Sequence, residues 1–409
     1  MRRVLIISFH FPPRPAVGGL RAYGLARYLP SFGWEPVVLT SDLPSLPARL
    51  ECPVIQVPFR DPLGKVKRAF GIDGSQNLTC QVSQLKQSLR VPFLDYGVKA
   101  YGEVMAYPDP YRSWYRDALA VAQGIPCDAV VSTSYPPTVH MVASQAGRPW
   151  VADFRDLWTQ NHYYPYSPMR KAIEERLEKK VLSSALTLTT ASEELSQELG
   201  QLHGRKVSTI LNGFDPETVN GGDCPVSSHL SIVYTGTIYE GRQSPEMLFQ
   251  ALQQIGVTSA SGLTVDFYGP VYPWLDTMAG KYGLKGMVRQ HGYVSHEEAL
   301  LRQREAQVLL LLLWNDSRFG GIYTAKLFEY LAARRPVLAV GPFYDSASRL
   351  IRTVGAGASC FSVEWCCQEL ERMFRSHRDS GHVEYHGNGI SQYSWVNMAR
   401  KFAAVLDSL

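Results

Sequence analysis

The feature that most constrains the fold of this chain is a regular alternation between short apolar runs and longer segments with helical periodicity. Runs such as RVLIIS (3–8) and EPVVLTS (35–41) are rich in Val, Ile and Leu and are too short for helices. The segment between them, 20–34, instead spaces its apolar residues three or four positions apart, so that they share one helix face. Continuous apolar strands separated by helices are typical of a parallel sheet covered on both faces. The sequence therefore predicts an α/β fold. The predicted strands are 3–8, 35–41, 53–59, 127–134, 148–154, 185–192, 206–212, 230–236, 263–269, 288–293, 306–314, 335–341 and 358–363.

The polar, glycine-rich stretch NGFDPETVNGGDCP (212–225) interrupts this alternation in the middle of the chain. At 409 residues the chain is also too long for one ordinary core. We therefore predict two doubly wound domains, residues 1–214 and 215–390, with 212–225 as the linker. The last helix, within residues 391–409, can pack on either domain, including back on the first. Because ligands of doubly wound sheets bind at the carboxyl ends of strands, we expect an interdomain cleft between two such edges.

Composition and charge exclude several classes of protein. Apolar residues make up 45% and charged residues 19%, which is typical of globular rather than disordered chains. The net charge of +4 is mild and no Lys/Arg block is dense, which argues against a nucleic-acid partner. The seven cysteines show no C-x-x-C spacing, and the longest apolar runs fall short of the ~18 residues of a spanning helix. We therefore expect a cytoplasmic protein with reduced thiols.

The stretch FGGIYTAKLFEYLAARRPVLAV (319–340) carries the clearest site signal. Gly320 and Gly321 precede a helix that begins near Thr324, and free amides at a helix start form an anion site. Lys326 falls in the first turn, within reach of a phosphate. Glu329 lies one turn later on the apolar face, where its carboxylate could accept both hydroxyls of a ribose. The alternative is a surface ion pair between Lys326 and Glu329, three residues apart.

A second anion-binding feature follows the first strand of the second domain. In YTGTIYEGR (234–242), Gly236 ends the strand and Arg242 lies in the next loop, where its planar guanidinium could clamp a diphosphate. An exposed loop arginine without a ligand is the alternative.

The first domain carries a glycine pair and a charged cluster after its strands. Gly18 and Gly19 begin a helix, but the pattern is not G-x-G-x-x-G, which disfavours a dehydrogenase. VADFRDLW (151–158) places three charged candidates, Asp153, Arg155 and Asp156, at one sheet edge. They either orient an acceptor hydroxyl or neutralise one another structurally.

Two further observations concern catalysis. His140 follows the two prolines of STSYPPTVH and is a candidate catalytic residue; the alternative is a structural role, which is the commoner one for a lone helical histidine. No D-x-D pair follows a strand, so we expect a mechanism without metal, in which cations and helix dipoles stabilise the diphosphate.

These motifs together resemble the retaining glycosyltransferases of family 4. The likeness rests on PPRPAVGGLRAYGLARYLPSFGWEPVVLT, STSYPPTVH, RPWVADFRDLW, TTASEEL, LNGFDPE, YTGTIYEGR, HGYVSHEEAL and, most specifically, TAKLFEYLAARRPVLAV. It is strongest for the subgroup that acts in bacterial surface-polysaccharide assembly, such as aminosugar transferases. The resemblance implies the GT-B fold of two facing Rossmann-like domains, a UDP- or GDP-linked sugar as donor, and no cofactor.

The resemblance also implies roles for individual residues. Glu329 matches the family's ribose-binding acid, Arg242 its basic residue after the first strand of the second domain, and Lys326 a lysine common in the subgroup. The family expects a glutamate eight residues before Glu329, and Gly321 stands there instead. Sugar contacts must then come from backbone amides or from neighbours such as Asn315 or Asp316.

The remaining family matches place the rest of the ligand. Gly18 and Gly19 match the family's glycine-rich loop, and the loop at Tyr293 and Val294 is expected beside the nucleobase. The lysine that the family usually has shortly after Arg242 is missing from this chain.

The acceptor is expected on the first domain and is a glycan or a lipid-linked hydroxyl. The irregular region 60–115 mixes basic with aromatic residues, which suits either peripheral binding to an anionic inner-membrane surface or an ordinary solvated face. Two other functions stay open: a nucleotide-sugar epimerase of the same fold, and a non-catalytic sugar-nucleotide-binding subunit.

Overall fold

The computed structural model describes residues 1–14, 17–45, 50–61, 103, 106–162, 164–219, 226–258, 261–319 and 321–409. The chain forms two compact units. Unit 1 comprises Met1–Leu211 and Trp395–Leu409, and unit 2 comprises Asn212–Ser394. The division falls three residues before the boundary expected after residue 214.

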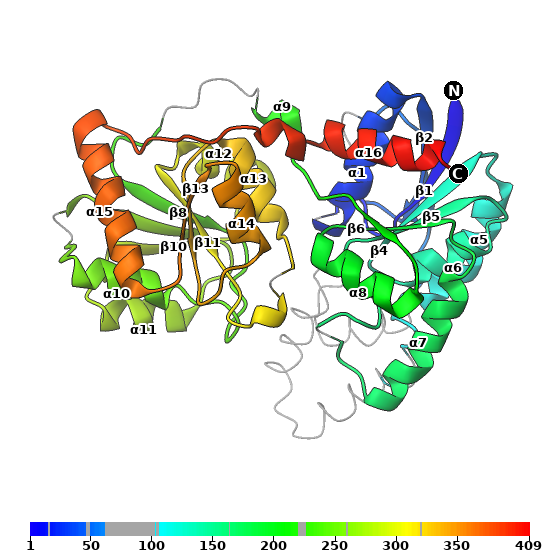
Figure 1. Ribbon diagram of the computed structural model, residues 1–409, viewed down its shortest axis with the longest axis horizontal. Coiled ribbons are helices and arrows are strands. Elements are labelled where there is room, and N and C mark those ends of the chain that lie inside the picture. The colour runs from blue at the N-terminus through cyan, green and yellow to red at the C-terminus, as the bar shows by residue number, and fades with distance from the viewer. Residues whose placement is uncertain are drawn as a thin grey trace. The chain divides into compact units, whose positions relative to one another are not determined.

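Unit 1 is built on a parallel sheet in the order β3-β2-β1-β4-β5-β6-β7 (Figure 1). Its strands are β1 (Arg2–Ile7), β2 (Trp34–Ser41), β3 (Val54–Val57), β4 (Ala129–Ser134), β5 (Trp150–Phe154), β6 (Thr187–Thr190) and β7 (Val207–Thr209). Its helices are α1 (Leu20–Tyr28), α5 (Tyr115–Gly124), α6 (Thr138–Ser144), α7 (Pro168–Leu182), α8 (Glu193–His203) and α16 (Trp395–Asp407).

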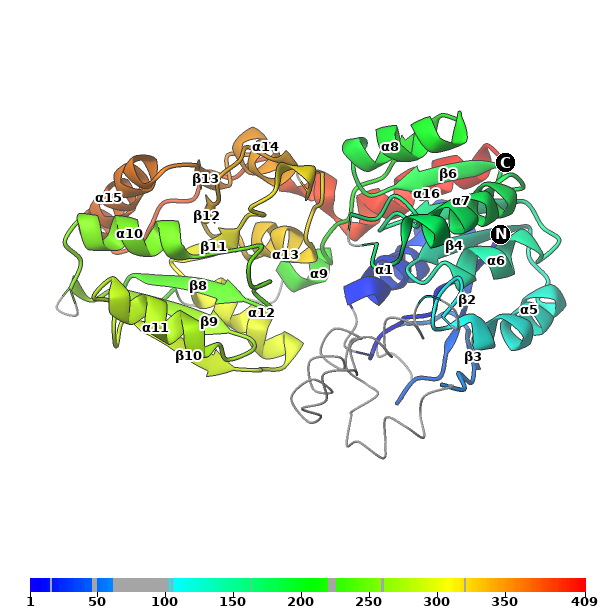
Figure 2. The ribbon, with the colours of Figure 1, turned by 90° about the horizontal axis from the view of Figure 1, so that it is seen from below.

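Both faces of the unit 1 sheet are buried, as the continuous apolar strands predict. On β1, Leu5 and Ile7 point into a core with α5, α6, α7 and α8, while Val4 and Ile6 point into a core with α1 and α16. All four side chains are fully buried. Helix α16 therefore returns from the end of the chain to unit 1, where it lies beside α1 (Figures 1 and 2).

Unit 2 contains a second parallel sheet in the order β10-β9-β8-β11-β12-β13. The strands are β8 (Ser231–Thr235), β9 (Thr264–Tyr268), β10 (Val288–Gly292), β11 (Val308–Leu312), β12 (Val337–Val340) and β13 (Gly357–Cys360). The helices are α9 (Pro216–Val219), α10 (Glu246–Gln254), α11 (Pro273–Lys281), α12 (His296–Glu305), α13 (Ala325–Ala333), α14 (Ser346–Thr353) and α15 (Val363–Ser380). Helices α12 and α13 lie on the opposite side of this sheet from α10 and α11 (Figure 1).

Local sequence signals explain where many helices begin and end. At α8, the Ser192 side chain accepts from the Leu195 amide, Glu193 and Glu194 lie in the first turn, and Gly204 ends the helix in a left-handed conformation. The Ser295 side chain caps the start of α12 in the same way.

The structure confirms the predicted α/β class and every predicted strand. Most strands are shorter than predicted, and β1, β2 and β13 begin one residue earlier. The expected linker 212–225 is partly helical, because α9 begins at Pro216, a residue suited to the first helical turn. Most of the irregular region, 62–102 and 104–105, lies outside the described residues. No helix among the described residues is long and apolar enough to cross a membrane.

The strand orders identify the edges where ligands are expected. The order reverses between β1 and β4 in unit 1 and between β8 and β11 in unit 2. Crevices at the carboxyl ends of strands that flank such a reversal are the usual ligand sites of doubly wound sheets. The loops after these four strands carry most of the residues singled out from the sequence.

Candidate functional site

The candidate donor site lies at the reversal point of unit 2, where β8 ends. Gly236 follows β8 with a φ of 101°, a conformation that favours glycine, and its amide donates to the Tyr268 carbonyl at 2.7 Å. A Cβ at position 236 would lie 3.4 Å from both Cε and Nζ of Lys326, in the first turn of α13. The structure thus brings Gly236 and Lys326 side by side.

The side-chain amine of Lys326 lies in an apolar environment. Its Nζ lies 3.7 Å from the centroid of the Tyr234 ring, a cation–π contact. Burial lowers the pKa of Lys326 from 10.5 to about 7, and the nearby Glu329 carboxylate opposes this shift in part. An anionic ligand beside Nζ would raise this pKa and favour the ammonium.

The Glu329 carboxylate is partly exposed on α13, with 22% of its side-chain surface accessible. Its Oε2 accepts a hydrogen bond of 3.2 Å from Gln303 Nε2, and its Oε1 lies 3.9 Å from His296 Nε2; both partners are on α12. The alternative of an ion pair between Lys326 and Glu329 does not describe these residues, because Nζ lies over Tyr234 and the carboxylate faces α12.

Gln303 was not singled out from the sequence. Its side chain is 1% exposed, and its Nε2 also donates to Thr235 Oγ1 at 2.9 Å. Thr235 in turn donates its amide hydrogen to the Tyr330 hydroxyl at 3.1 Å. The sequence offered little reason to select Gln303, because a glutamine in a helix is usually predicted to be exposed unless its packing against the sheet is known.

Arg242 lies in the loop that follows β8 and is exposed. Its amide donates to the Tyr239 carbonyl at 2.9 Å, and its own carbonyl accepts from the Asn315 amide at 2.7 Å. Next to it, buried Gln243 donates through Nε2 to the Leu312 carbonyl at the end of β11. The guanidinium therefore projects from a loop whose backbone is held against the reversal point.

The other donor-site candidates have less defined positions. Gly321 lies in the turn before α13, and Gly320 lies outside the described residues. Tyr293 is 74% exposed and Val294 is half-buried. Both follow β10, and β9 lies between β10 and β8 in the sheet, so they are displaced along the edge from Lys326.

In unit 1 the structure brings Gly18 and Arg155 together. A Cβ at position 18 would lie only 2.7 Å from Arg155 Nη1, so a larger residue there would displace the guanidinium. Gly19 is packed as closely against the chain at His10 and Phe11. Arg155 Nη2 also donates to Asp156 Oδ2 at 2.6 Å, so this pair and Gly18 form one group at the carboxyl edge.

His10 joins this edge and was also not singled out. It lies in the loop after β1, and burial together with the nearby Arg155 and Arg14 cations lowers its pKa to about 4. Its imidazole is therefore neutral at physiological pH. A histidine just after the first strand was a signal that the sequence did offer.

Asp153 is placed differently from its predicted neighbours. Its carboxylate is fully buried and pairs with Arg21 through two hydrogen bonds of 2.8 Å, while Thr133 and Thr189 donate to the same oxygens. Arg21 comes from α1, so this ion pair ties α1 to the sheet. These contacts give Asp153 a structural role, away from Arg155 and Asp156.

His140 is also fully buried. Its Nδ1 shares a 2.7 Å hydrogen bond with Ser132 Oγ, and its ring lies 4.4 Å from that of Phe154. Burial lowers the pKa of His140 to about 3, with Asp153 opposing the shift. The ring is a neutral core group in this arrangement, without access to a substrate.

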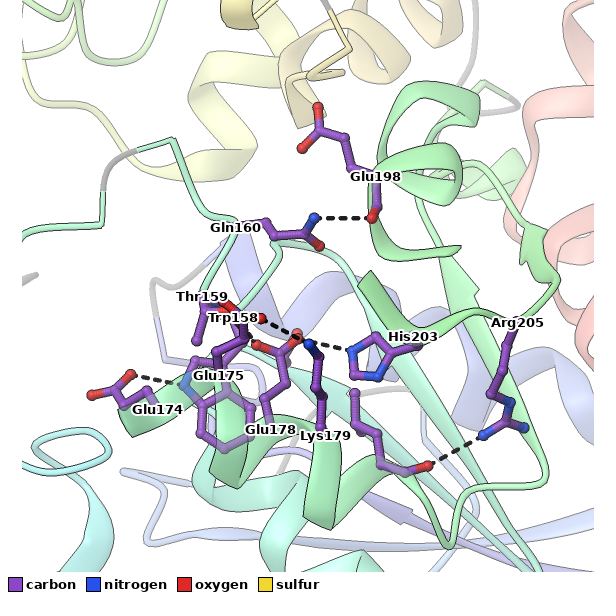
Figure 3. Close-up of polar contacts among 12 residues, drawn as sticks. Trp158, Thr159, Gln160, Glu174, Glu175, Glu178, Lys179, Glu198, His203 and Arg205 are labelled. Carbon is purple, nitrogen blue, oxygen red and sulfur yellow. Dashed lines mark hydrogen bonds and ion pairs between the residues drawn. The ribbon is translucent and has the colours of Figure 1, made fainter. Parts of the chain in front are cut away.

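A pocket of about 580 Å³ lies elsewhere, between α7 and α8 of unit 1. Its basic side chains already have partners: Lys179 pairs with Glu175, His203 lies 3.3 Å from buried Glu178, and Arg205 donates to backbone carbonyls (Figure 3). In the described part of the chain, no three His, Cys, Asp or Glu residues gather into a potential metal site. A mechanism without metal stays a prediction.

The comparisons with known proteins agree with this geometry. Residues 18–213 match the family model described as a glycosyl transferase 4-like domain. No curated protein sequence matches the chain significantly.

Several solved structures resemble the whole chain. Sucrose-phosphate synthase from Thermosynechococcus elongatus has a TM-score of 0.62 at 15% identity, covering 100% of this chain and 99% of that chain. Anabaena HepE in complex with UDP has 0.62 at 14% identity, covering 100% of both chains. A putative UDP-N-acetylglucosamine 2-epimerase from Listeria monocytogenes has 0.56 at 13% identity, covering 99% and 96%.

At such identities these likenesses show the fold, and the two parallel sheets with their flanking helices are those of GT-B proteins. Most of unit 1 is covered by the family match. Residues 18–213 therefore match the glycosyl transferase 4-like domain family, and the chain that contains them has the GT-B fold.

Proposed function

We propose that this protein transfers a sugar from a UDP- or GDP-linked donor to a hydroxyl of a glycan or lipid-linked acceptor, with retention of anomeric configuration. The observation that carries the proposal is the trio at the reversal point of unit 2. Gly236 leaves room beside β8, Lys326 offers a cation there, and Glu329 offers an acceptor one helical turn away.

Each group has a defined task in the proposed donor complex. Lys326, Arg242 and the first amides of α13 bind the diphosphate, and Glu329 accepts from the ribose hydroxyls. Because charge builds on the diphosphate as the glycosidic bond breaks, cations placed there stabilise the transition state more than the ground state. With Gly321 at the family's glutamate position, sugar contacts fall to backbone amides and to Asn315.

The acceptor is assigned to the edge of unit 1 that holds Arg155 and Asp156. Asp156 is 41% exposed at its side chain and accepts from Arg155. It can hold an acceptor hydroxyl in place for attack on the oxocarbenium-like sugar from the face that the diphosphate leaves. Asp153 and His140 were candidate catalytic residues; we propose instead that they stabilise the sheet.

Related structures support the donor class. HepE was solved with UDP and with UDP-glucose, and it has the same fold over its whole length. A uridine or guanosine diphosphate is therefore the first ligand to test.

The decisive experiment is calorimetric titration of UDP and GDP into wild type and Glu329→Gln. We expect at least one nucleotide to bind wild type and the variant to lose about tenfold or more, because a carboxylate is replaced at a charge-assisted hydrogen bond. Glu298→Gln, an exposed acid on α12 that pairs with Arg302, is the matched control. Equal affinity of wild type and Glu329→Gln would remove the assignment.

A second function with a specific observation in its favour is an epimerase, because a putative epimerase shares the fold. Incubation with a panel of nucleotide sugars, with and without glycan acceptors, separates the two. A transferase gives a glycoside whose anomeric configuration matches the donor, by NMR, whereas an epimerase releases an altered sugar without acceptor. Binding without either reaction would indicate a non-catalytic subunit.

Peripheral membrane binding is proposed for the basic and aromatic region that includes Lys65, Arg68 and Phe70, which lie outside the described residues. Flotation with anionic liposomes at low salt tests it. Failure to float would leave a soluble glycan as the proposed acceptor.

A further inference from the structure

We infer that Gln303 is a positioning residue for the donor site: it aims the Glu329 carboxylate at the ribose and thereby sets the preference for a ribonucleotide. The inference rests on the proposed donor function of Glu329. It concerns a residue on α12 that has not been assigned to the site by sequence or by similarity.

The first argument is the direction of the hydrogen bonds. Gln303 Nε2 lies 2.9 Å from Thr235 Oγ1 and 3.2 Å from Glu329 Oε2. A carboxylate oxygen only accepts, so the amide nitrogen must be the atom that faces Glu329. Both hydrogens of the amide are then used, one on each partner, and the amide cannot turn without losing the bond to Glu329.

The second argument is that the anchor of Gln303 is rigid. Thr235 ends β8 and is 5% exposed, and its amide donates to the Tyr330 hydroxyl at 3.1 Å. Tyr330 is fully buried and is the residue after Glu329 on α13. The chain of contacts therefore runs from Glu329 through α12 to the end of β8 and back to α13, which fixes the carboxylate relative to the strand that carries the site.

The third argument is that the Gln303 side chain lowers the stability of the fold. Gln303 Oε1 is buried and has no hydrogen-bond partner in the described part of the chain. A buried polar atom without a partner destabilises the fold, and a methionine or leucine would fill the same space without that penalty. Conflicts of this kind between stability and local chemistry are expected at functional sites.

A buried glutamine four residues further along shows the contrast. Gln307 is also 1% exposed, but its Nε2 donates to the Ser227 and Gly381 carbonyls and its Oε1 accepts from the Val383 amide. Both ends of that side chain are satisfied by backbone groups far from Glu329. Gln307 is therefore the structural counterpart, matched in residue type, burial and unit.

The consequence for ligand recognition follows from the ribose. A carboxylate held at one angle can accept from both hydroxyls of the 2′,3′-diol, whereas a freely rotating one must first lose side-chain entropy on binding. Removing Gln303 should therefore weaken binding of ribonucleotides and have little effect on 2′-deoxynucleotides, which present one hydroxyl fewer.

The test is titration calorimetry with UDP, GDP and their 2′-deoxy forms on wild type, Gln303→Met, Gln307→Met and Glu329→Gln. For Gln303→Met we expect about a fivefold to tenfold loss for the ribonucleotide that wild type binds and less than about a twofold loss for its deoxy form, the range of one hydrogen bond to a charged group. Gln307→Met should lower the melting temperature without changing the ratio of the two affinities.

The outcomes separate the inference from the proposed function. If wild type binds no nucleotide, or Glu329→Gln binds as tightly as wild type, the proposed function fails. If Glu329→Gln is impaired while Gln303→Met keeps the wild-type ratio of ribo to deoxy affinities, only the role of Gln303 is overturned. Should Gln303→Met not fold, Thr235→Val, which removes the acceptor that anchors the amide, must reduce the same ratio, and an unchanged ratio refutes the inference.

Discussion

Lys326 shows, at the scale of a single residue, how a binding group can oppose folding. Its pKa falls from 10.5 to about 7 because it is buried beside an aromatic ring. Between these two values the unfolded chain binds more protons than the folded one, so this residue makes stability rise as the pH increases from about 7 towards 10.5. At and below pH 7 the buried ammonium lowers the free energy of unfolding.

Replacing Lys326 with methionine is therefore expected to stabilise the free protein at pH 6–7 and to flatten the rise in stability towards pH 9. The same variant should bind UDP or GDP more weakly, because the cation beside the diphosphate is lost. Urea unfolding at pH 6, 7.5 and 9 measures the first effect and calorimetry the second. Lys285→Met, at an exposed lysine of the same unit, is the control; an unchanged pH profile in Lys326→Met would contradict the assignment.

Asp153, in contrast to Lys326, stabilises the folded protein at neutral pH. Its pKa is lowered, because the Arg21 guanidinium and two threonine hydroxyls outweigh the effect of burial. Its stabilising contribution is therefore present above the ordinary aspartate pKa and is lost as the pH falls through the lowered one.

Asp153→Asn leaves Arg21 buried without a counter-charge, and we expect it to cost about 3–5 kcal/mol of unfolding free energy near neutral pH. Glu35→Gln, which breaks the half-exposed pair with Arg3, should cost less than about 1 kcal/mol. Denaturant unfolding of both variants at pH 7 tests this. Similar losses in the two would mean that Asp153 does not act as the buried half of an ion pair.

At the scale of elements, side chains of α7 form hydrogen bonds with the segment that follows β5. The Trp158 indole donates to Glu174, and the Thr159 amide and hydroxyl both donate to Glu178 Oε2, at 3.0 and 2.6 Å (Figure 3). His203, the last residue of α8, lies 3.3 Å from the other oxygen of Glu178. One buried carboxylate thus holds a loop and two helices together.

Glu178→Gln replaces an acceptor with an amide that cannot accept from all of these donors. We expect a loss of about 1–3 kcal/mol and faster amide hydrogen exchange at Thr159, because its amide loses a charged acceptor. Glu175→Gln, on the exposed side of the same helix, should leave that amide protected. Normal protection at Thr159 in Glu178→Gln would show that the loop is held by other contacts.

At the scale of the whole molecule, the chain ends in the unit where it began. Helix α16 buries Met398 and Phe402 against α1, and Trp395 lies against Tyr23 at 5.8 Å between ring centroids. Unit 1 therefore combines two segments that are separated in sequence by unit 2, which is itself contiguous.

We expect Phe402→Ala to lower the stability of unit 1 alone, by about 3–5 kcal/mol for a buried aromatic side chain. Phe249→Ala, which removes an equally buried ring from the core of unit 2, should destabilise only that unit. Hydrogen exchange resolved by peptide distinguishes the two. Faster exchange in β8–β13 of Phe402→Ala would show that the units do not unfold independently.

Much of this fold could be predicted from the sequence, because the patterns that indicate it lie within short segments of the chain. Strand β11 is apolar at every position, and β1 at its last four, because both faces of a parallel sheet are covered. This pattern can be recognised in the sequence without knowing which segments pack against the strand. The strand–loop–helix start at α13 was equally plain, so Lys326 and Glu329 could be named.

The partners of those residues could not be read in this way. Arg21 and Asp153 are 132 positions apart, and Gln303 and Glu329 belong to different helices. Proximity in sequence suggested that Asp153 would join Arg155 and Asp156. Asp153, however, lies inside β5, where its side chain meets Arg21 of α1, whereas Arg155 and Asp156 lie in the loop beyond the end of this strand. Which helix a strand residue meets depends on how the sheet and its helices pack.

The sequence by itself determined the two α/β units, their strands and the glycine-led helix starts, because these follow from periodicity and backbone preference within a few residues. Only the tertiary structure decided that Asp153 and His140 are core groups, that α16 belongs to unit 1 and that Gln303 holds Glu329. These depend on contacts between distant segments, and hydrogen bonding and burial act through space rather than along the chain.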